Sequence, residues 1–258
     1  EAQKPVYILD RPNPLGGTVT EGLIQKPEDY SFVGAYSVPI RYGLTIGELA
    51  QLYVSEKQLA VDLHVITCTG WSREMLWPDT GQIFTVPSPN IPNWQTALLY
   101  PGTCLIEGTN LSEGRGTSRP FTWFGAPWID QEELFTALDA LEHPGLELRP
   151  QGFIPSFSKH KDAHCKGVTL EITDPDAVRS VQFMVQAIST LRRLYPDHFE
   201  LIGVGSGVKF MERLMGADFV RTAWSPEGAP GGVDAGSFSR DEAQAAQVFA
   251  ERVQEHLL

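Results

Sequence analysis

The order in which hydrophobic periodicities follow one another constrains the fold of this chain most. Alternation of apolar and polar residues with a period of two predicts a β-strand, and a period of 3.6 predicts a helix. Strands are expected at residues 6–10, 59–67 and 168–173, the first of them buried. Helices are expected at 45–53, 130–143 and 174–195 and from residue 239. Strands and helices therefore alternate along the chain, which predicts the α/β or α+β class.

Capping residues mark where the predicted helices begin. Thr45 followed by Glu48 has the spacing of a capping box, as do the pairs 130/133 and 239/242. Asp174 followed by Pro175 begins what we expect to be the longest helix. The apolar faces expected to enter the core are Ile46, Leu49, Ala50 and Tyr53 in the first helix, Val178, Val181, Val185, Ile188 and Leu191 in the third, and Ala246, Phe249 and Val253 in the last.

Residues 70–125 contain no long periodic segment and are rich in Trp, Pro, Gly, Asn and Ser. A long irregular stretch inside a compact domain is usually functional, so we expect ligand-binding loops here. Aromatic side chains in and just after this stretch could pack on the apolar faces of sugar rings, and core packing is the alternative for most of them. They are Trp71, Trp77, Trp94, Tyr100, Phe121, Trp123, Phe124 and Trp128.

Composition excludes some classes of function. The chain has 258 residues, 20 Lys and Arg against 32 Asp and Glu, and a net charge of −12, which argues against a nucleic-acid partner. No run approaches the roughly 18 apolar residues of a membrane span, so no membrane insertion is expected. The cysteines, Cys68, Cys104 and Cys165, are odd in number. They are either three reduced thiols or one disulfide and a spare thiol.

Two loops concentrate hydrogen-bonding side chains. Asp10, Arg11 and Asn13 follow the first predicted strand, where ligands bind in open α/β sheets, and Glu21 could act there as an acid or base. A loop salt bridge and a tight turn are the alternative. Residues 107–117 hold two Glu, one Asn, one Arg, one Ser and two Thr among three Gly, which suits a polyhydroxylated ligand. A solvated connection is the alternative for this loop.

Residues 158–165 combine lysines, histidines and a cysteine. His160, His164 and Cys165 suggest zinc, but they lack a fourth ligand and a second spaced pair. We therefore expect no metal site here and favour a binding loop that carries Lys159.

Several motifs of the chain occur in the same order in a known family. They are LDRPNPLGG (9–17), SFVG (31–34), RYGLTIGELA (41–50), GWSR (70–73), VPSPNIPN (86–93), YPGTCLIEGTNLSEGRGT (100–117), FGAPW (124–128) and, from residue 153, FxPxFSK followed by CxG. The stretch IEGTNLSEGRGT is long and specific. Across residues 9–214 the chain resembles the exo-β-N-acetylmuramidase family.

The resemblance implies a bacterial glycoside hydrolase of peptidoglycan recycling, which releases N-acetylmuramic acid from the non-reducing end and needs no cofactor. It implies a Rossmann-like domain followed by a smaller mixed α/β domain, with the active site between them. Residues 1–56 are then the last strand, loop and helix of the first domain, and 57–258 form the second. Peptidoglycan-derived muramyl saccharides are the expected partners, and their location implies a periplasmic or secreted protein.

The chain departs from the family pattern in two respects. It carries Tyr42 where members usually have His, and Leu44 where they usually have Met. The family also has a long upstream segment with Pro-Glu-His-Gly and Asp-Ile-Gln-Asp motifs, which do not occur here. We therefore expect this chain to be the later part of a longer enzyme, whose leading catalytic Glu cannot be mapped onto it.

Glycoside cleavage needs one carboxyl group to protonate the leaving oxygen and usually a second as nucleophile or base. The catalytic candidates are Glu21, Glu107 and Glu113. The substrate-binding candidates are Asp10, Arg11, Asn13, Arg73, Asn90, Asn110, Arg115 and Lys159. Among them the arginines could pair with the lactyl carboxylate, and the asparagines could hold hydroxyl and acetamido groups. The alternative function is a cell-wall sugar or glycopeptide binding module without catalysis.

Overall fold

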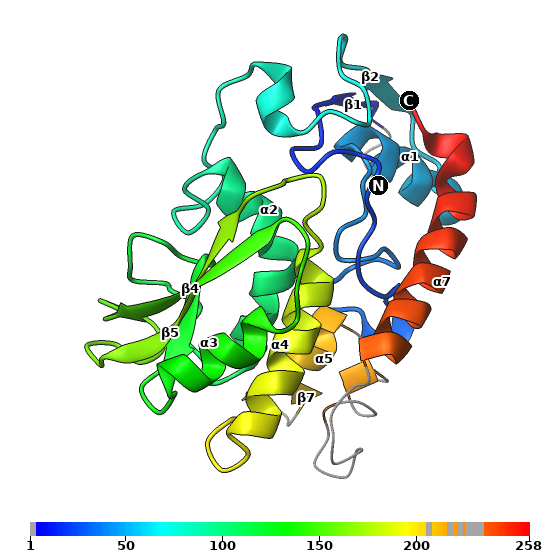
Figure 1. The fold of residues 1–258 in the computed structure, drawn as a ribbon. Coiled ribbons are helices and arrows are strands. Elements are labelled where there is room, and N and C mark those ends of the chain that lie inside the picture. The colour runs from blue at the N-terminus through cyan, green and yellow to red at the C-terminus, as the bar shows by residue number, and fades with distance from the viewer. Residues whose placement is uncertain (1–3, 205–207, 216–218, 221–223, 225–234) are drawn as a thin grey trace.

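A computed structural model describes residues 4–204, 208–215, 219–220, 224 and 235–258. Figure 1 shows a sheet with helices packed against it, and a long C-terminal helix that lies beyond these helices, away from the sheet. The described strands form a parallel pair, an antiparallel sheet of three, and an antiparallel pair. Parallel and antiparallel strands alternate with helices, which confirms the mixed α/β class. Among the described residues, no helix has both the length and the hydropathy needed to cross a membrane.

The parallel pair consists of β1 (Val6–Leu9) and β2 (Leu63–Ile66). The alternation predicted for β2 is confirmed, because Leu63 and Val65 are half-buried while His64 and Ile66 are exposed. The prediction that the first strand is buried is wrong, since Tyr7 is 62 % and Leu9 73 % exposed. Within the described residues β1 pairs with β2 alone. The two strands lie on either side of the predicted domain boundary after residue 56, which stays a prediction.

Helix α1 (Ile46–Glu56) begins at the predicted capping box, in which Thr45 and Glu48 satisfy each other's backbone amides. Asp10 adds two contacts at this end: it accepts hydrogen bonds from Thr45 Oγ1 at 2.7 Å and from the Gly47 amide at 2.8 Å. The predicted core face is wrong in part. Ile46 is 51 % exposed, whereas Leu52 on another face is buried.

The three-stranded sheet has the order β3-β5-β4, with β3 at Trp123–Ala126, β4 at Leu146–Phe153 and β5 at Cys165–Ile172. Strands β3 and β4 were not predicted, and β5 begins before the predicted Val168. In the central strand β5, Val168 and Leu170 are buried as expected. Thr169 is buried too, because it lies between Trp123 and Arg149 of the neighbouring strands.

Helices α2 (Trp94–Thr103), α3 (Gln131–Asp139) and α4 (Ser180–Leu194) accompany this sheet. Helix α3 begins at Asp130 as predicted and ends at Asp139, short of residue 143. Helix α2 lies within the stretch expected to be irregular, together with the 3₁₀ turns η2 (Trp77–Thr80) and η3 (Cys104–Gly108). Gly102 allows α2 to approach α4, since a Cβ there would lie 1.9 Å from the Ser180 carbonyl oxygen. Half of the eight aromatic residues named above serve the core: Trp77, Trp94, Phe121 and Phe124 are buried.

Helix α4 begins at Ser180 rather than at the predicted Asp174, and its predicted face is buried from Val181 to Leu191. The longest described helix is instead α7 (Ala235–Val253), which starts before the predicted Ser239. Glu242 does not complete a capping box. Its carboxylate accepts a hydrogen bond from the Gly22 amide at 2.7 Å, which ties α7 to the N-terminal loop.

The remaining elements complete the described fold. They are η1 (Pro27–Asp29), β6 (Gly203–Val204), β7 (Val208–Lys209), α5 (Phe210–Met215) and η4 (Gln254–His256). One large core joins the sheet to α2, α3, α4 and α5, and a small cluster joins α1 to α7. At the end of the chain, the Leu258 amide donates to Glu48 Oε1 at 2.9 Å. The three thiols are free, with Cys104 and Cys165 buried.

Candidate active site

The predicted loop 107–117 starts within the 3₁₀ turn η3, which directly follows α2. Two of its glycines have the positive φ angles that glycine tolerates best, +75° at Gly114 and +80° at Gly116. A Cβ at Gly116 would lie 2.6 Å from the Phe157 amide nitrogen. The glycine therefore lets this loop lie directly against the loop that carries Lys159.

Four of the predicted site residues meet between these loops. Arg115 Nε lies 3.0 Å from Glu113 Oε1, and its Nη2 lies 2.6 Å from Glu107 Oε1. Lys159 Nζ lies 2.9 Å from Glu113 Oε2. The guanidinium of Arg115 also stacks on Phe121, with 4.9 Å to the ring centroid. Two carboxylates and two cations thus form one network.

Burial differs sharply within this network. The side chain of Glu113 is 3 % exposed, whereas that of Glu107 is 24 % exposed. Although the Lys159–Glu113 contact is an ion pair, Glu113 Oε2 makes no hydrogen bond of good geometry. The buried Glu113 therefore holds Arg115 and Lys159 from the protein interior, whereas the carboxylate of Glu107 is partly exposed at the surface.

Lys159 is held by the backbone as well as by Glu113. Its ammonium donates to the carbonyl oxygens of Ile106 and Thr109, each at 2.9 Å. Burial lowers the pKa of Lys159 below its usual value, and the Glu113 carboxylate opposes that shift. The flanking residues Ser158 and His160 both have positive φ, so the loop around Lys159 has a strained backbone.

We call the open pocket above this network the glutamate pocket. Its volume is about 560 Å³, and its walls are Glu107, Glu113, Arg115, Phe157, Ser158, Lys159, Ile202 and Phe210. The sequence analysis did not single out Phe157, Ile202 or Phe210. Apolar residues in loops and at the start of α5 give no periodic signal that would mark them as a pocket wall.

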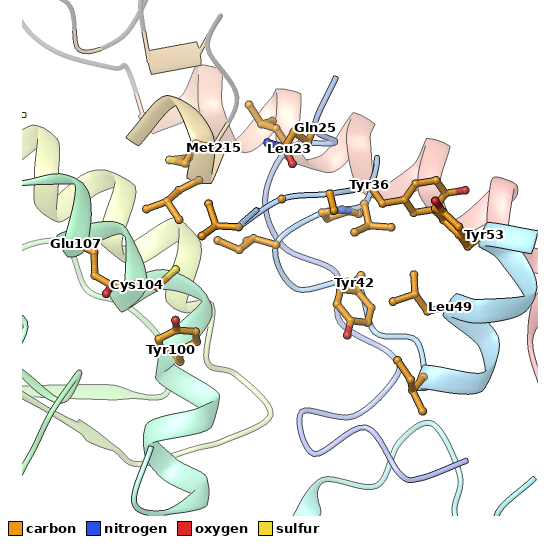
Figure 2. A pocket seen from close by; sticks show the side chains of 18 of the residues that line it. Leu23, Gln25, Tyr36, Tyr42, Leu49, Tyr53, Tyr100, Cys104, Glu107 and Met215 are labelled. Carbon is orange, nitrogen blue, oxygen red and sulfur yellow. The ribbon is translucent and has the colours of Figure 1, made fainter. Parts of the chain in front are cut away.

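A second open pocket lies next to it, which we call the tyrosine pocket. Its volume is about 680 Å³, and its walls include Tyr36, Tyr42, Tyr53 and Tyr100 together with Glu107 and Phe210. Figure 2 shows Tyr100, Cys104 and Glu107 on one wall, and Tyr36, Tyr42, Leu49 and Tyr53 on the other. The apolar face predicted for the first helix is part of this wall, because Ile46, Leu49, Ala50 and Tyr53 all line it.

The structure places Glu21 elsewhere. It is 1 % exposed and is paired with Arg41 at 2.8 Å, while its other oxygen accepts from the Val181 amide at 2.9 Å. This arrangement matches the alternative of a salt bridge that holds a loop. Glu21 lines neither pocket.

Most residues of the first predicted loop, and the separate candidate Arg73, hold local structure. Asp10 caps α1. Asn13 donates to the Leu44 carbonyl oxygen at 2.9 Å and accepts from the Leu15 amide. Arg73 pairs with the buried Glu48 at 2.6 Å and donates to the carbonyl oxygens of residues 17 and 43. Arg11 differs from these, since it is exposed and makes no ion pair or hydrogen bond with the described residues.

Two further candidates lie outside the network. Asn90 belongs to a turn in which its backbone amide donates a hydrogen bond to Ser88 Oγ. Asn110 donates to the His198 carbonyl oxygen at 2.7 Å and accepts from the Glu200 amide, so it fixes the loop to the segment before β6. In the part of the chain described here, no three His, Cys, Asp or Glu side chains lie close enough together to hold a metal ion. His160 instead contacts the Asn110 carbonyl oxygen at 2.7 Å.

Comparison with known proteins gives consistent matches over the whole chain. The family model for the N-terminal part of exo-beta-N-acetylmuramidase NamZ matches residues 1–95, and the model for its C-terminal part matches residues 98–258. The peptidoglycan beta-N-acetylmuramidase NamZ of Bacillus subtilis is 45 % identical over 218 residues, which are 84 % of this chain and 52 % of that protein. The chain thus spans about half the length of this curated relative.

Two crystal structures of DUF1343 family proteins from Bacteroides fragilis share the fold. Their TM-scores are 0.87 and 0.72, with 30 % and 28 % sequence identity. Each comparison covers 99 % of this chain and 66 % of the solved chain. The fold described above therefore occurs within longer proteins.

Proposed function

Since the chain belongs to the exo-beta-N-acetylmuramidase NamZ family, we propose that it forms part of a glycoside hydrolase acting on peptidoglycan. The proposed reaction releases N-acetylmuramic acid from the non-reducing end of peptidoglycan fragments. The 45 % identity with the B. subtilis protein supports this assignment. The proposal concerns the natural gene product that contains this sequence, because the chain spans about half of that relative.

The observation that carries the proposal is the ion-pair network at the glutamate pocket. Glycoside hydrolysis needs carboxyl groups beside the scissile bond. Glu107 is partly exposed and lines both pockets, so we assign it the contact with the saccharide. Glu113 is buried between Arg115 and Lys159, so we assign it the positioning of these two cations.

The proposed substrate also implies a place of action. Muramyl saccharides derive from the cell wall, so we propose a periplasmic or secreted protein. The net charge of −12 repels anionic saccharides at long range, and capture then depends on single cations at the pockets.

One observation favours binding without catalysis as a second candidate function. Both carboxylates of the glutamate pocket are engaged in ion pairs, which need the charged form. A general acid must instead carry a proton when the substrate is bound. The same pocket therefore also suits holding a saccharide without protonating its leaving group.

Hydrolysis of a chromogenic N-acetylmuramyl glycoside separates the two functions. The 258-residue chain and the natural gene product that contains it should be assayed side by side, with the N-acetylglucosaminyl glycoside as control substrate. We expect muramyl-specific turnover from the gene product. Saccharide binding without turnover in both proteins would support the binding module. Neither turnover nor binding at millimolar saccharide would contradict both functions.

A further inference from the structure

Three open pockets of the described structure share wall residues and so are neighbours, and we call the three together the groove. The third, which we call the Arg11 pocket, has a volume of about 270 Å³ and is lined by residues from 11–15 and 40–46. It shares Ile40, Tyr42 and Ile46 with the tyrosine pocket, which in turn shares Glu107 and Phe210 with the glutamate pocket. The groove therefore runs from Arg11, past Tyr42, to the ion-pair network.

The middle of the groove is amphipathic. Its wall is mostly aliphatic, but four tyrosines add rings with a polar tip, and Figure 2 shows Tyr42 on the wall opposite Tyr100. Tyrosine offers a large apolar surface and a hydroxyl group at low cost in conformational entropy. A saccharide matches this wall, since each ring has an apolar face and peripheral hydroxyl groups.

The groove has one described cation that no protein group neutralises. Arg115 is paired with Glu107 and Glu113, and Lys159 with Glu113. Arg41, which also lines the Arg11 pocket, is buried and paired with Glu21. Arg11 is exposed at the end of the groove and makes no ion pair or hydrogen bond within the described ranges. Its guanidinium can bind a carboxylate through two parallel hydrogen bonds.

We propose that Arg11 recognises a carboxylate of a muramyl saccharide whose rings lie along the tyrosine pocket toward Glu107. This inference rests on the proposed function and adds a specificity-determining residue to it. The carboxylate is either the lactyl group of the sugar or the end of an attached peptide. A saccharide without a carboxylate uses the same tyrosine wall but gains nothing from Arg11.

Calorimetric titration of the 258-residue chain tests this assignment. The ligands are the disaccharide of N-acetylmuramic acid and N-acetylglucosamine, the same disaccharide with its lactyl group amidated by a dipeptide, and the uncharged dimer of N-acetylglucosamine. Arg11→Gln should weaken binding of a carboxylate-bearing ligand about tenfold and leave the uncharged dimer unchanged. A loss with the free lactyl disaccharide identifies the lactyl carboxylate. A loss confined to the peptide-bearing form identifies the peptide carboxylate.

The matched control is Arg149→Gln, which removes an exposed arginine of β4 outside the groove and should leave all three affinities unchanged. Tyr42→Ala should weaken all three ligands, because the tyrosine wall serves the saccharide itself. If the wild type and Arg11→Gln bind both carboxylate-bearing ligands with equal affinity, the inference about Arg11 is overturned. The proposed function is tested separately, because muramyl-specific turnover would still support it. Equal loss for the uncharged dimer, or no binding by the wild-type chain, would overturn it as well.

Discussion

At the scale of single residues, Glu113 organises most of the candidate site. Its carboxylate is 3 % exposed and lies within 3.0 Å of Arg115 Nε and 2.9 Å of Lys159 Nζ. A buried carboxylate with two cationic partners is costly to remove, because both partners then lose their counter-charge. The orientation of Arg115, and through it of Glu107, depends on this one group.

Glu113→Gln should therefore lower both stability and turnover. The neutral amide keeps the shape but leaves Lys159 and Arg115 without their shared anion, at a cost of about 2 kcal/mol in the free energy of unfolding. Misplaced cations should lower the turnover of a muramyl glycoside by about 100-fold. Urea denaturation of the chain and turnover by the natural gene product measure the two effects.

The control for this variant is Glu147→Gln, whose ion pair with Arg149 is 51 % exposed on the Glu side. It should change the free energy of unfolding by less than about 0.5 kcal/mol. If Glu113→Gln behaves like this control in both assays, the positioning role of Glu113 is wrong.

Single residues also show what a sequence leaves open. Arg11, Arg73 and Arg115 are equivalent as candidate partners for a carboxylate when only their types are known. Their availability depends on residues far along the chain: Arg73 meets Glu48 at 2.6 Å, 25 positions away. Glu21 likewise meets the Val181 amide, 160 positions away, which accounts for its burial. No local pattern encodes such distant partners.

At the scale of elements, the local caps of α1 and α3 were predicted correctly, whereas α4 and α7 begin away from their predicted first residues. The capping box at Thr45 and the cap at Asp130 involve partners within three residues, so they can be recognised locally. The apolar face of α1 instead lines an open pocket, because what covers a face depends on distant elements. Helix α2 was not predicted because Pro101 and Gly102 lie inside it, and its close packing against α4 explains Gly102.

The contact of α7 with the N-terminal loop should depend on pH through Glu242. Burial, and to a smaller extent the nearby Glu21, raises the pKa of Glu242 from 4.5 to about 7, while the Gly22 amide and Arg179 oppose the shift. The folded chain then binds this proton more tightly than the unfolded chain. The free energy of unfolding should therefore fall as pH rises from about 4.5 to about 7.

Glu242→Gln should remove that part of the pH dependence and keep the acceptor for the Gly22 amide. At pH 8 the variant should be more stable than the wild type by roughly 1–3 kcal/mol, and at pH 4 the two should be equal. Urea denaturation at both pH values measures this. Glu251→Gln, on the exposed side of α7, is the control. A variant that matches this control at pH 8 would contradict the prediction.

At the scale of the whole molecule, the groove exists only because distant parts of the chain meet. Tyr36, Tyr42 and Tyr53 come from the N-terminal part, whereas Tyr100 and Glu107 come from α2 and η3. A ligand in the groove contacts both parts of the chain, so it binds the folded state and not the unfolded state. Ligand binding should then stabilise the molecule as a unit.

The muramyl disaccharide should raise the melting temperature of the chain. At ten times its dissociation constant it adds about 1.4 kcal/mol, which corresponds to roughly 3–6 °C for a chain of this size. Thermal denaturation followed by tryptophan fluorescence measures the shift, and glucose serves as the control sugar. An unchanged melting temperature at this saturation would mean that the disaccharide binds the folded and unfolded chains equally well. That result would contradict binding in the groove.

The sequence by itself determined the family, the α/β class and the caps of α1 and α3, because motifs and capping boxes depend on residues that are neighbours along the chain. It also brought the loop 107–117 and Lys159 forward as site candidates, and the structure joins them in one network. Only the tertiary structure decided that Glu21 is buried in a salt bridge, that Arg11 is unpaired among the described residues, and that a helix face lines a groove. The reason is physical: burial and ion pairing are properties of contacts between distant segments, and folding alone brings those segments together.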